Sequence, residues 1–304
     1  MGGLFRINTN VQATFAQRQL HRSSADLDRA QERLSSGLRI NTAADDAAGL
    51  AISEKLSMAG RGLSQAQDNA QDGISVLQTA EGGLESIGDD LQRMRELAVQ
   101  AANDSLTDDD RALIQTEIDQ LVDEIDRTAS TVQFNQRQLL KNDFTTVDES
   151  GAAQEGEGPS SLSFHVGANR DEVITVTAED DIRTATADSL DVRGLATPED
   201  NDDAEGVLQS REGAESAIET ISEAINDISE TRANIGAVQN RLEGAVDFLQ
   251  IQYENTEASE SAIRDADVAE EAVNQTRANI LTQAGTSVLG QAQQTPQMAL
   301  QLLQ

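Results

Sequence analysis

The sequence is poor in the residues from which compact domains are built. Cysteine and tryptophan are absent, and aromatic residues make up 2% of the 304 residues. Without cysteine, a disulfide framework, a thiol nucleophile and a thiolate metal site are excluded. Because aromatic side chains supply much of the buried area in most cores, this chain must obtain its buried area from many small aliphatic side chains instead. Long helices packed side by side allow this, so the composition favours them over a compact globule.

Proline and long apolar runs are also scarce. The three prolines, Pro159, Pro198 and Pro296, leave two long stretches in which none interrupts a helix. No run of about 18 apolar residues occurs, so no membrane-spanning segment is predicted. The first residues lack the charged-then-apolar layout of a cleaved secretory signal. Arg6 stands where a myristoylation site requires Ser or Thr.

Positive charge is the third shortage. The chain has 22 basic and 54 acidic residues, a net charge of −32, and its only lysines are Lys55 and Lys141. Such a charge repels nucleic acids and acidic membranes, so neither is expected as a partner. We hypothesise adaptation to high salt, where screening lets acidic surfaces approach each other. The alternative is an ordinary acidic, soluble surface protein.

The strongest positive signal is a repeat of small and aliphatic residues at alternating spacings of four and three. It runs unbroken from Ala66 to Ala101, returns from Ile114 to Val132, and continues from Ala214 to Leu249. A seam this long is a coiled-coil pattern. Thr107 and Asp110 form a capping box that predicts where the second helix begins. The predicted core seam includes Leu77, Leu84, Leu91, Ile118, Leu121, Ile225, Ile235 and Leu242.

Both ends of the chain carry thinner seams, rich in Ala, Ser and Thr. Such helices are marginal alone and need a partner, which is the expected behaviour of segments that order only on assembly. We therefore predict that both apolar stripes are unpaired in a single chain. The predicted assembly seam comprises Leu20, Leu27, Leu34, Val273, Ile280 and Val288.

The middle of the chain has a different composition from its two helical parts. Residues 143–160 are polar and rich in glycine, whereas Leu162–Val166 and Glu172–Thr177 predict a short pair of strands. The predicted fold is mainly α, an elongated antiparallel helical bundle or coiled coil with a small β element. Residues 1–44 and 255–304 are expected to form a terminal helical domain. Residues 45–254 are expected to form a rod-like core domain, with the β region at about 141–197.

Five blocks of sequence stand out along the chain. Glu32–Asn41 and Asp45–Gly49 lie near the start, and Leu91–Gln100 lies in the first long seam. Gly236–Leu242 and Gln283–Leu289 lie in the second half. In this order the blocks resemble the N- and C-terminal signatures of bacterial flagellins, and the resemblance covers nearly the whole chain.

The resemblance implies a structural subunit that polymerises into the flagellar filament, the helical propeller for swimming, with no catalysis and no cofactor. It implies an extracellular location after export without a cleaved signal peptide. The implied partners are other copies of the chain, the flagellar export chaperone, the filament cap and the hook-junction proteins. Few residues are available near 180–200 for large outer domains, so the chain is similar to a minimal flagellin. Gln136 stands where relatives usually have Gly, which leaves the turn after Phe134 and Asn135 open.

Other readings are weaker. Within the family, a hook–filament junction protein shares the terminal pattern. Outside it, the alternative is a secreted coiled-coil adhesin or enzyme carrier, which would be favoured if the two ends did not associate.

The resemblance also implies a candidate contact with the vertebrate Toll-like receptor for flagellin. The matching positions are Gln92, Arg93 and Leu97, with Glu117 on the facing helix. Arg93 and Leu97 lie off the predicted seam, so we expect an exposed leucine beside an arginine, which suits a contact surface. Subunit packing alone is the alternative role.

Remaining motifs predict no catalytic or metal site. Ser287 lies in a segment with the wrong spacing for a hydrolase elbow, and His21 and His165 lack partners at ligand spacing. Residues Asn201–Glu212 fall at calcium-loop spacing, but the first position is Asn and no helix precedes it. An acidic linker that leads into the next helix is the favoured interpretation of that segment.

Overall fold

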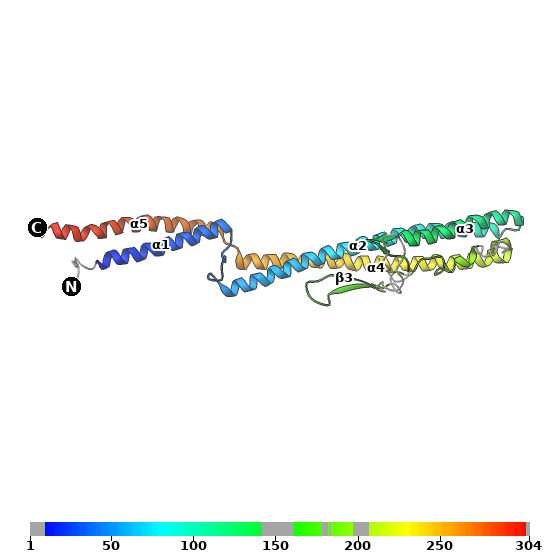
Figure 1. Cartoon of the computed structure of the whole chain (residues 1–304), viewed down its shortest axis with the longest axis horizontal. Coiled ribbons are helices and arrows are strands. Elements are labelled where there is room, and N and C mark those ends of the chain that lie inside the picture. The colour runs from blue at the N-terminus through cyan, green and yellow to red at the C-terminus, as the bar shows by residue number, and fades with distance from the viewer. Residues whose placement is uncertain (1–9, 142–160, 178–181, 183, 197–206, 302–304) are drawn as a thin grey trace. The chain divides into compact units, whose positions relative to one another are not determined.

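The computed structural model describes residues 10–141, 161–177, 182, 184–196 and 207–301. The predicted mainly α fold is confirmed, with five α-helices and two small hairpins in these residues (Figure 1). None of the described helices combines the length and hydropathy that a membrane span requires.

The chain divides into two compact units. Unit 1 is Met1–Gly60 with Glu254–Gln304, and unit 2 is Arg61–Tyr253. Two long helices, α2 (Ala47–Ala101) and α4 (Arg211–Arg264), run through the boundary and contribute to both units. Both boundaries between the units, after residue 60 and before residue 254, therefore fall inside a helix.

Unit 2 is built from α2, α3 (Asp108–Thr131) and α4. The predicted capping box opens α3, because the Thr107 hydroxyl accepts from the Asp110 amide at 3.3 Å and the Asp110 carboxylate accepts from the Thr107 amide at 3.1 Å. The Asp110 carboxylate also accepts from the Thr107 hydroxyl at 2.7 Å, and this bond first, then the one from the Thr107 amide, holds the pKa of Asp110 below its usual value. Three aspartates in the first turn of α3 also favour the positive end of the helix dipole.

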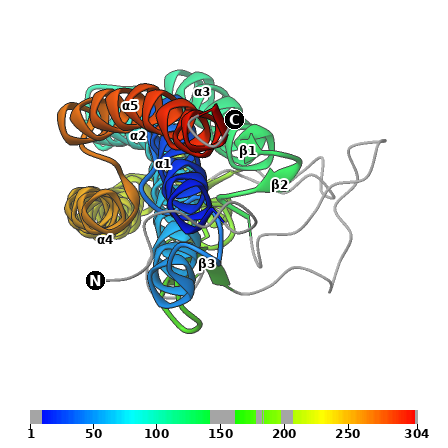
Figure 2. The same cartoon turned by 90° about the vertical axis from the view of Figure 1, so that its left-hand side faces the viewer.

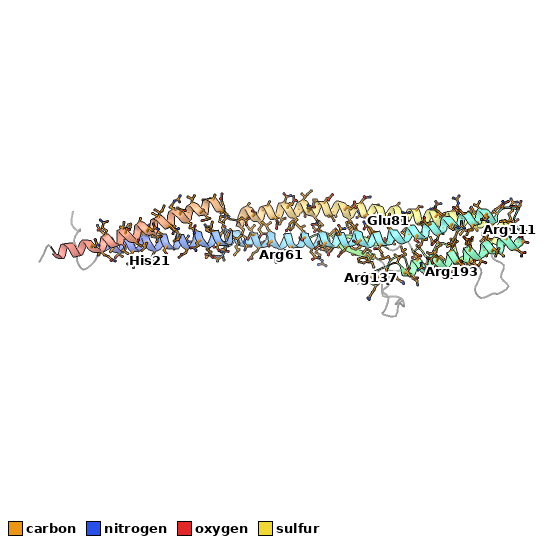
Figure 3. All side chains as sticks on the ribbon, turned by 90° about the horizontal axis from the view of Figure 1, so that it is seen from above. His21, Arg61, Glu81, Arg111, Arg137 and Arg193 are labelled. Carbon is orange, nitrogen blue, oxygen red and sulfur yellow. The ribbon has the colours of Figure 1, made fainter. Side chains whose placement is uncertain are left out.

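Arg111 closes the turn between α2 and α3. Its side chain is almost fully buried and donates to the carbonyls of Ala101, at 2.9 Å, and Asn103, at 3.1 Å. It also pairs with Asp108 at 3.2 Å. The last carbonyls of a helix lack partners within the helix. This guanidinium, at the end of unit 2 in Figure 3, satisfies the carbonyl of Ala101 at the end of α2 and that of Asn103 in the turn where the chain reverses direction.

The core of unit 2 follows the heptad-like seam. Six of the predicted core positions have exposed fractions of 0%, namely Leu77, Leu84, Leu91, Ile118, Ile235 and Leu242. Leu121 and Ile225 are half-buried at the edge of the same cluster. This cluster joins α2, α3 and α4 through aliphatic side chains and methionine, as the shortage of aromatics predicts.

The hairpin β3 (Ser161–His165) and β4 (Val173–Thr177) confirms the predicted strand pair, with Phe164 opposite Ile174. It docks on α2, where a Cβ at Gly73 would lie 3.0 Å from the Phe164 ring. The Asn69 side chain also donates to the carbonyl of His165 at 3.1 Å. Glycine at position 73 therefore permits the hairpin to approach the helix.

A second hairpin, not predicted from the sequence, follows α3 directly. It joins β1 (Gln133–Phe134) to β2 (Arg137–Gln138), beside the end of α3 (Figure 2). Both turn residues are left-handed, with φ of 47° at Asn135 and 65° at Gln136. Two-residue hairpin turns with positive φ at both positions favour Asn-Gly, so Gln136 occupies a position suited to glycine.

Replacing Gln136 with glycine should stabilise the protein. A left-handed conformation costs a residue with a Cβ about 1–2 kcal/mol, and glycine loses roughly 0.5–1 kcal/mol of backbone entropy on ordering. We expect Gln136→Gly to raise the free energy of unfolding by about 0.5–1 kcal/mol in urea titrations followed by circular dichroism. The matched control is Gln133→Gly in extended β1, which should destabilise; equal effects from both changes would contradict this explanation.

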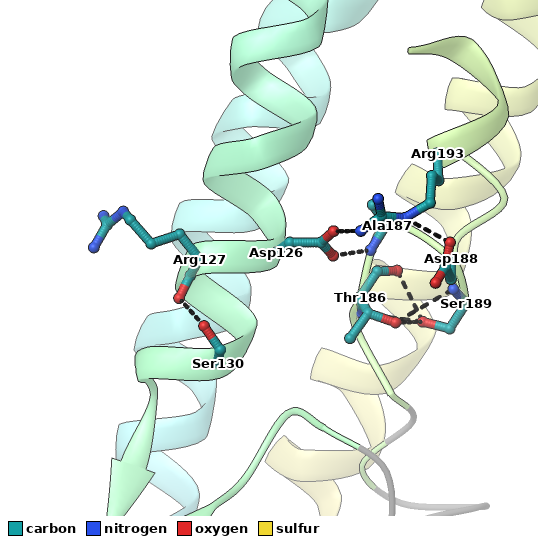
Figure 4. A network of polar contacts seen from close by, with 8 residues as sticks. All are labelled: Asp126, Arg127, Ser130, Thr186, Ala187, Asp188, Ser189 and Arg193. Atoms are coloured by element: carbon teal, nitrogen blue, oxygen red, sulfur yellow. Dashed lines mark hydrogen bonds and ion pairs between the residues drawn. The ribbon is translucent and has the colours of Figure 1, made fainter. Parts of the chain in front are cut away.

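A strap (residues 184–196) lies along α3 and ends in the short helix η2 (Arg193–Leu195). The Asp126 carboxylate anchors it by accepting from the Ala187 amide at 2.8 Å and pairing with Arg193 (Figure 4). Arg193 also pairs with Asp188 at 2.7 Å within the strap. The apolar side chains of the strap complete the core of unit 2: Ala185, Ala187, Leu190, Val192 and Leu195.

Gln115 fixes both the end of the strap and the start of the segment that leads into α4. The side chain is 3% exposed; its amide donates to the Leu195 carbonyl at 2.7 Å and to Asp119 at 2.8 Å. Its oxygen accepts from the amide of Leu208, in η3 (Val207–Gln209), at 3.0 Å. One buried amide thus satisfies two backbone groups that are distant in sequence.

Gln115→Ala should destabilise unit 2. It would leave a buried carbonyl and a buried amide without partners, at about 1–3 kcal/mol each, so a loss of roughly 2–4 kcal/mol in urea titrations is expected. Amide exchange at Leu208 should accelerate in parallel. The control is Gln120→Ala, an exposed residue on the same helix, which should change stability by less than about 0.5 kcal/mol. Similar losses from both variants would contradict the role given to the Gln115 hydrogen bonds.

Candidate assembly site

Unit 1 is formed mainly by two paired helices, α1 (Val11–Ser36) and α5 (Val268–Gln301). The residues of α1 that are buried are small and seven apart: Ala16, Ser23 and Ala30. On α5, Ala278 is 5% exposed, and a Cβ added at Gly285 would lie 3.2 Å from the Leu20 side chain. Small residues on both helices therefore allow their close pairing.

Polar contacts fix the pair at both ends. At the start of α1, the Asn10 side chain caps the helix by accepting from the Ala13 amide at 3.0 Å and donates to the Ala292 carbonyl at 2.8 Å. At the other end, the Arg33 guanidinium pairs with buried Glu271 at 3.1 Å. These contacts set the register of α1 along α5.

Backbone hydrogen bonds continue the pairing past the end of α1. This helix stops at Gly37, whose φ of 74° is left-handed and suits glycine. The Gly37 carbonyl accepts from the Ala266 amide at 2.9 Å, and the Arg39 amide donates to Arg264 at 2.7 Å. The segments before α2 and before α5 are thereby joined within one unit.

The structure separates the predicted assembly residues into two groups. Leu20, Leu27 and Leu34 are half-buried on the side of α1 that carries its buried residues. The prediction that both stripes are unpaired in a single chain is therefore wrong for α1, because α5 covers its stripe. The reason is that α5 turns a different, smaller-residue stripe towards α1.

The residues predicted on α5 remain open to solvent. Val273, Ile280 and Val288 have exposed fractions of 57%, 61% and 56%. They follow each other at intervals of seven and eight residues, so they share one face of the helix. From residue 278 to residue 304 the chain carries no charged residue. A sustained uncharged segment with exposed valine and isoleucine is unusual in a chain of charge −32.

Two apolar grooves border these side chains. One, of about 700 Å³, lies between α1 and α5, and Phe15, Leu281 and Val288 line it. The other, of about 480 Å³, lies along α5 at Val273 and Ile280. Contiguous exposed apolar surface of this kind marks an interaction site on a soluble protein. We call the exposed apolar residues of α1 and α5 the terminal apolar face: Val11, Phe15, Val268, Val273, Ile280, Leu281 and Val288.

The candidate receptor contact on unit 2 needs a correction. Leu97 is 2% exposed and belongs to the unit 2 core, so the prediction that it is exposed is wrong. Gln92 is exposed, and Arg93 pairs with Glu117 at 2.8 Å and with Glu96 at 3.2 Å. The side of α2 that faces other helices is wider than a single seam, which explains the burial of Leu97.

The other singled-out residues form no further site in the described part of the chain. His21 and His165 are exposed in different units, and the described residues contain no cluster that could hold a metal ion. The Ser287 hydroxyl donates to the Gln283 carbonyl of its own helix at 3.1 Å. Of the segment with calcium-loop spacing, residues 201–206 lie outside the described residues.

These features define a helical structural protein whose paired terminal helices carry an uncovered apolar face. Comparison with known proteins agrees with that class. The model of the bacterial flagellin N-terminal helical region matches residues 7–145, and that of the C-terminal helical region matches residues 218–303. The chain belongs to the bacterial flagellin family.

Individual relatives match over nearly their whole length. The flagellar filament core protein flaB2 of Brachyspira hyodysenteriae is 47% identical over 299 residues, which cover 98% of this chain and 99% of that protein. A flagellin of Halalkalibacterium halodurans is 43% identical over 297 residues, with the same coverage of 98% and 99%. Among solved structures, Bacillus cereus flagellin is 28% identical, covers 60% of this chain and 88% of that chain, and gives a TM-score of 0.46.

Family membership defines what the chain does in general terms. It is a structural subunit of the bacterial flagellar filament, an extracellular polymer of copies of the subunit. The family is structural rather than enzymatic.

Proposed function

We propose that copies of this chain join into the filament through the terminal apolar face of unit 1. The supporting observation is the distribution of exposed apolar side chains between the two units. Of the 15 large hydrophobic residues exposed in the described part of the chain, 9 belong to unit 1. Unit 1 is the smaller unit, so the enrichment is not an effect of size.

The geometry of this face favours an open polymer. It is carried by two different helices of one chain: residues of both α1 and α5 line the larger groove, whereas residues of α5 alone line the smaller one. A surface that docks on a different surface of the next copy produces a filament whenever the rotation does not close a ring. The filament then acts as the propeller for swimming.

The remaining proposed partners follow from the same exposure. Before assembly the terminal apolar face needs protection from non-specific association, a task suited to a flagellar export chaperone. Filament cap and hook-junction proteins would meet the same face at the two ends of the polymer. Recognition by a Toll-like receptor would rest on Gln92, Arg93 and Glu117, without the buried Leu97.

Replacing Ile280 with serine should weaken assembly without unfolding the subunit. Ile280 is 61% exposed in the single chain, so its substitution removes little from the monomer. Burying that exposed part in the filament contributes about 1–1.5 kcal/mol, and the critical concentration should therefore rise by roughly tenfold. The measurement is elongation of sheared filament seeds at several subunit concentrations, with circular dichroism as a check on helicity.

The control is Asn279→Ser, which alters an exposed polar neighbour on the same helix and removes no apolar surface. It should elongate seeds at the wild-type critical concentration. If Ile280→Ser also assembles at that concentration with unchanged helicity, the terminal apolar face does not carry assembly. A rise for both variants would equally contradict the proposal, because the effect would then not depend on apolar burial.

A further inference from the structure

The side-chain charge of unit 1 is divided between different segments of the chain. Residues 1–25 contain three arginines and no Asp or Glu, and residues 278–304 contain no charged residue. All 13 acidic residues of unit 1 lie in residues 26–60 and 254–277, together with 6 basic residues. The first two segments therefore carry a net charge of +3, and the other two carry −7.

The packing of α1 on α5 places these charges at opposite ends of unit 1. The two helices are antiparallel, because Asn10 donates to the Ala292 carbonyl at 2.8 Å and Arg33 pairs with Glu271 at 3.1 Å. The start of α1 and the end of α5 thus lie side by side, as Figure 1 shows, and share the positive end. The start of α5 lies at the negative end.

Two arginines at the positive end have no acidic partner. Arg18 and Arg22 are exposed and lie four residues apart on one face of α1. Among the described residues, no carboxylate lies within 4 Å of either guanidinium, and Asp26 pairs with Arg29 instead. Arg18 also lines the larger apolar groove together with Phe15. We call Arg18 and Arg22 the α1 arginines; like charges at this spacing destabilise a helix unless a partner offsets them.

Carboxylates of the opposite charge lie exposed at the start of α5. The Asp267 carboxylate accepts from the amides of Ala269, at 2.8 Å, and Glu270, at 3.3 Å. No basic group of the described chain lies within 4 Å of Glu270, which is exposed in the first turn of α5. Glu270 precedes the exposed Val273 by three residues, so it borders the terminal apolar face. We call Asp267 and Glu270 the α5 carboxylates.

The α1 arginines cannot reach the α5 carboxylates of their own chain. The ion pair between Arg33 and Glu271 places the start of α5 beside the end of α1. At about 1.5 Å per residue, Arg22 lies roughly 16 Å and Arg18 roughly 22 Å from the level of that ion pair. Side chains do not span this separation, so only a second copy can bring the two groups together.

We propose that the α1 arginines of one copy pair with the α5 carboxylates of the next copy in the filament. This pairing rests on the assembly role proposed for the terminal apolar face, whose edges both groups border. It concerns unit 1 as it packs in the filament and requires no order in the free subunit. Apolar burial supplies attraction without direction, whereas complementary charges fix the register and exclude wrong arrangements.

The pairing sets a stagger between neighbouring copies. The positive end of one unit 1 lies against the negative end of the next, so the copies are displaced by roughly 16–22 Å along their helices. Because the two surfaces in contact are different, the same step can repeat without closing. The charge division within unit 1 thus gives the polymer a polarity.

Charge reversal in the full-length protein tests the pairing. One variant combines Arg18→Glu with Arg22→Glu, and the other is Glu270→Arg, which leaves the Asp267 cap in place. Each alone should raise the critical concentration at least about tenfold, because like charges then meet between copies. All three changes in one chain restore opposite charges at every contact and should return the critical concentration to within about threefold of wild type.

The measured quantity is the subunit concentration left in the supernatant once filaments grown on wild-type seeds reach steady state and are pelleted. Circular dichroism of the free subunits should be unchanged in every variant, since unit 2 is untouched. Loss of assembly in both reversals without restoration in the combined chain would overturn the pairing. Assembly of either reversal at the wild-type concentration would overturn it as well.

A matched control separates pairing from net charge. Lys55→Glu with Arg170→Glu changes two exposed cations away from the α1 arginines and alters the net charge by the same amount. It should assemble within about threefold of wild type. An equal rise for this control and for Arg18→Glu with Arg22→Glu would show a general charge effect and contradict the pairing.

Ile280→Ser, measured in parallel, separates this pairing from the assembly role of the terminal apolar face. If Ile280→Ser raises the critical concentration and the charge reversals do not, the face carries assembly and the pairing is wrong. If Ile280→Ser assembles as wild type, the role of the face itself fails. A helical reconstruction should place a carboxylate oxygen of Glu270 or Asp267 within about 4 Å of an α1 arginine of a neighbouring copy; a filament in which these groups lie apart would contradict the pairing.

Discussion

The structure depends on how α1 and α5 pack against each other. Small residues lie at the centre of their contact, Ala16, Ser23 and Ala30 on one side and Ala278 and Gly285 on the other, so the helices pair closely. Because small residues of α5 face α1, the larger aliphatic side chains of α5 lie on its solvent-exposed side. The same constraint therefore shapes the monomer and leaves it with a surface that a neighbouring copy can cover.

Unit 2 is held together in a different way from unit 1. Its aliphatic seam joins three helices, but a core without large aromatics needs additional closure at its edges. The strap supplies that closure and is held by Asp126 and Gln115 of α3, each of which hydrogen-bonds to backbone groups as well as to a side chain. Buried polar side chains used in this way fix one arrangement of segments that would otherwise be free to slide.

Much of this architecture could be predicted from the sequence because spacing reports helix faces directly. The seam through Leu77, Leu84 and Leu91 and the cap at Thr107 depend only on neighbours a few residues away. Leu97 could not be assigned correctly, because α2 packs against more than one helix and its buried side is wider than one seam. The apolar pattern of α5 likewise did not reveal which of two stripes meets α1.

The contacts made by Gln115 and the Arg33–Glu271 pair lacked any sequence signal. Gln115 reaches backbone groups 80 and 93 residues away, and Arg33 reaches a residue 238 positions later. Polar residues at these positions are compatible with a solvated helix surface, and only the folded chain brings their partners near. Long-range polar contacts of this type depend on how helices are arranged, which local periodicity does not encode.

A helical reconstruction of the reassembled filament would test the assembly surface most directly. Val273, Ile280 and Val288 are 57%, 61% and 56% exposed in the single chain. We expect all three to be buried in the filament against α1 or α5 of neighbouring copies. If these side chains remain open to solvent while copies touch only through unit 2, the terminal apolar face is not what joins the subunits.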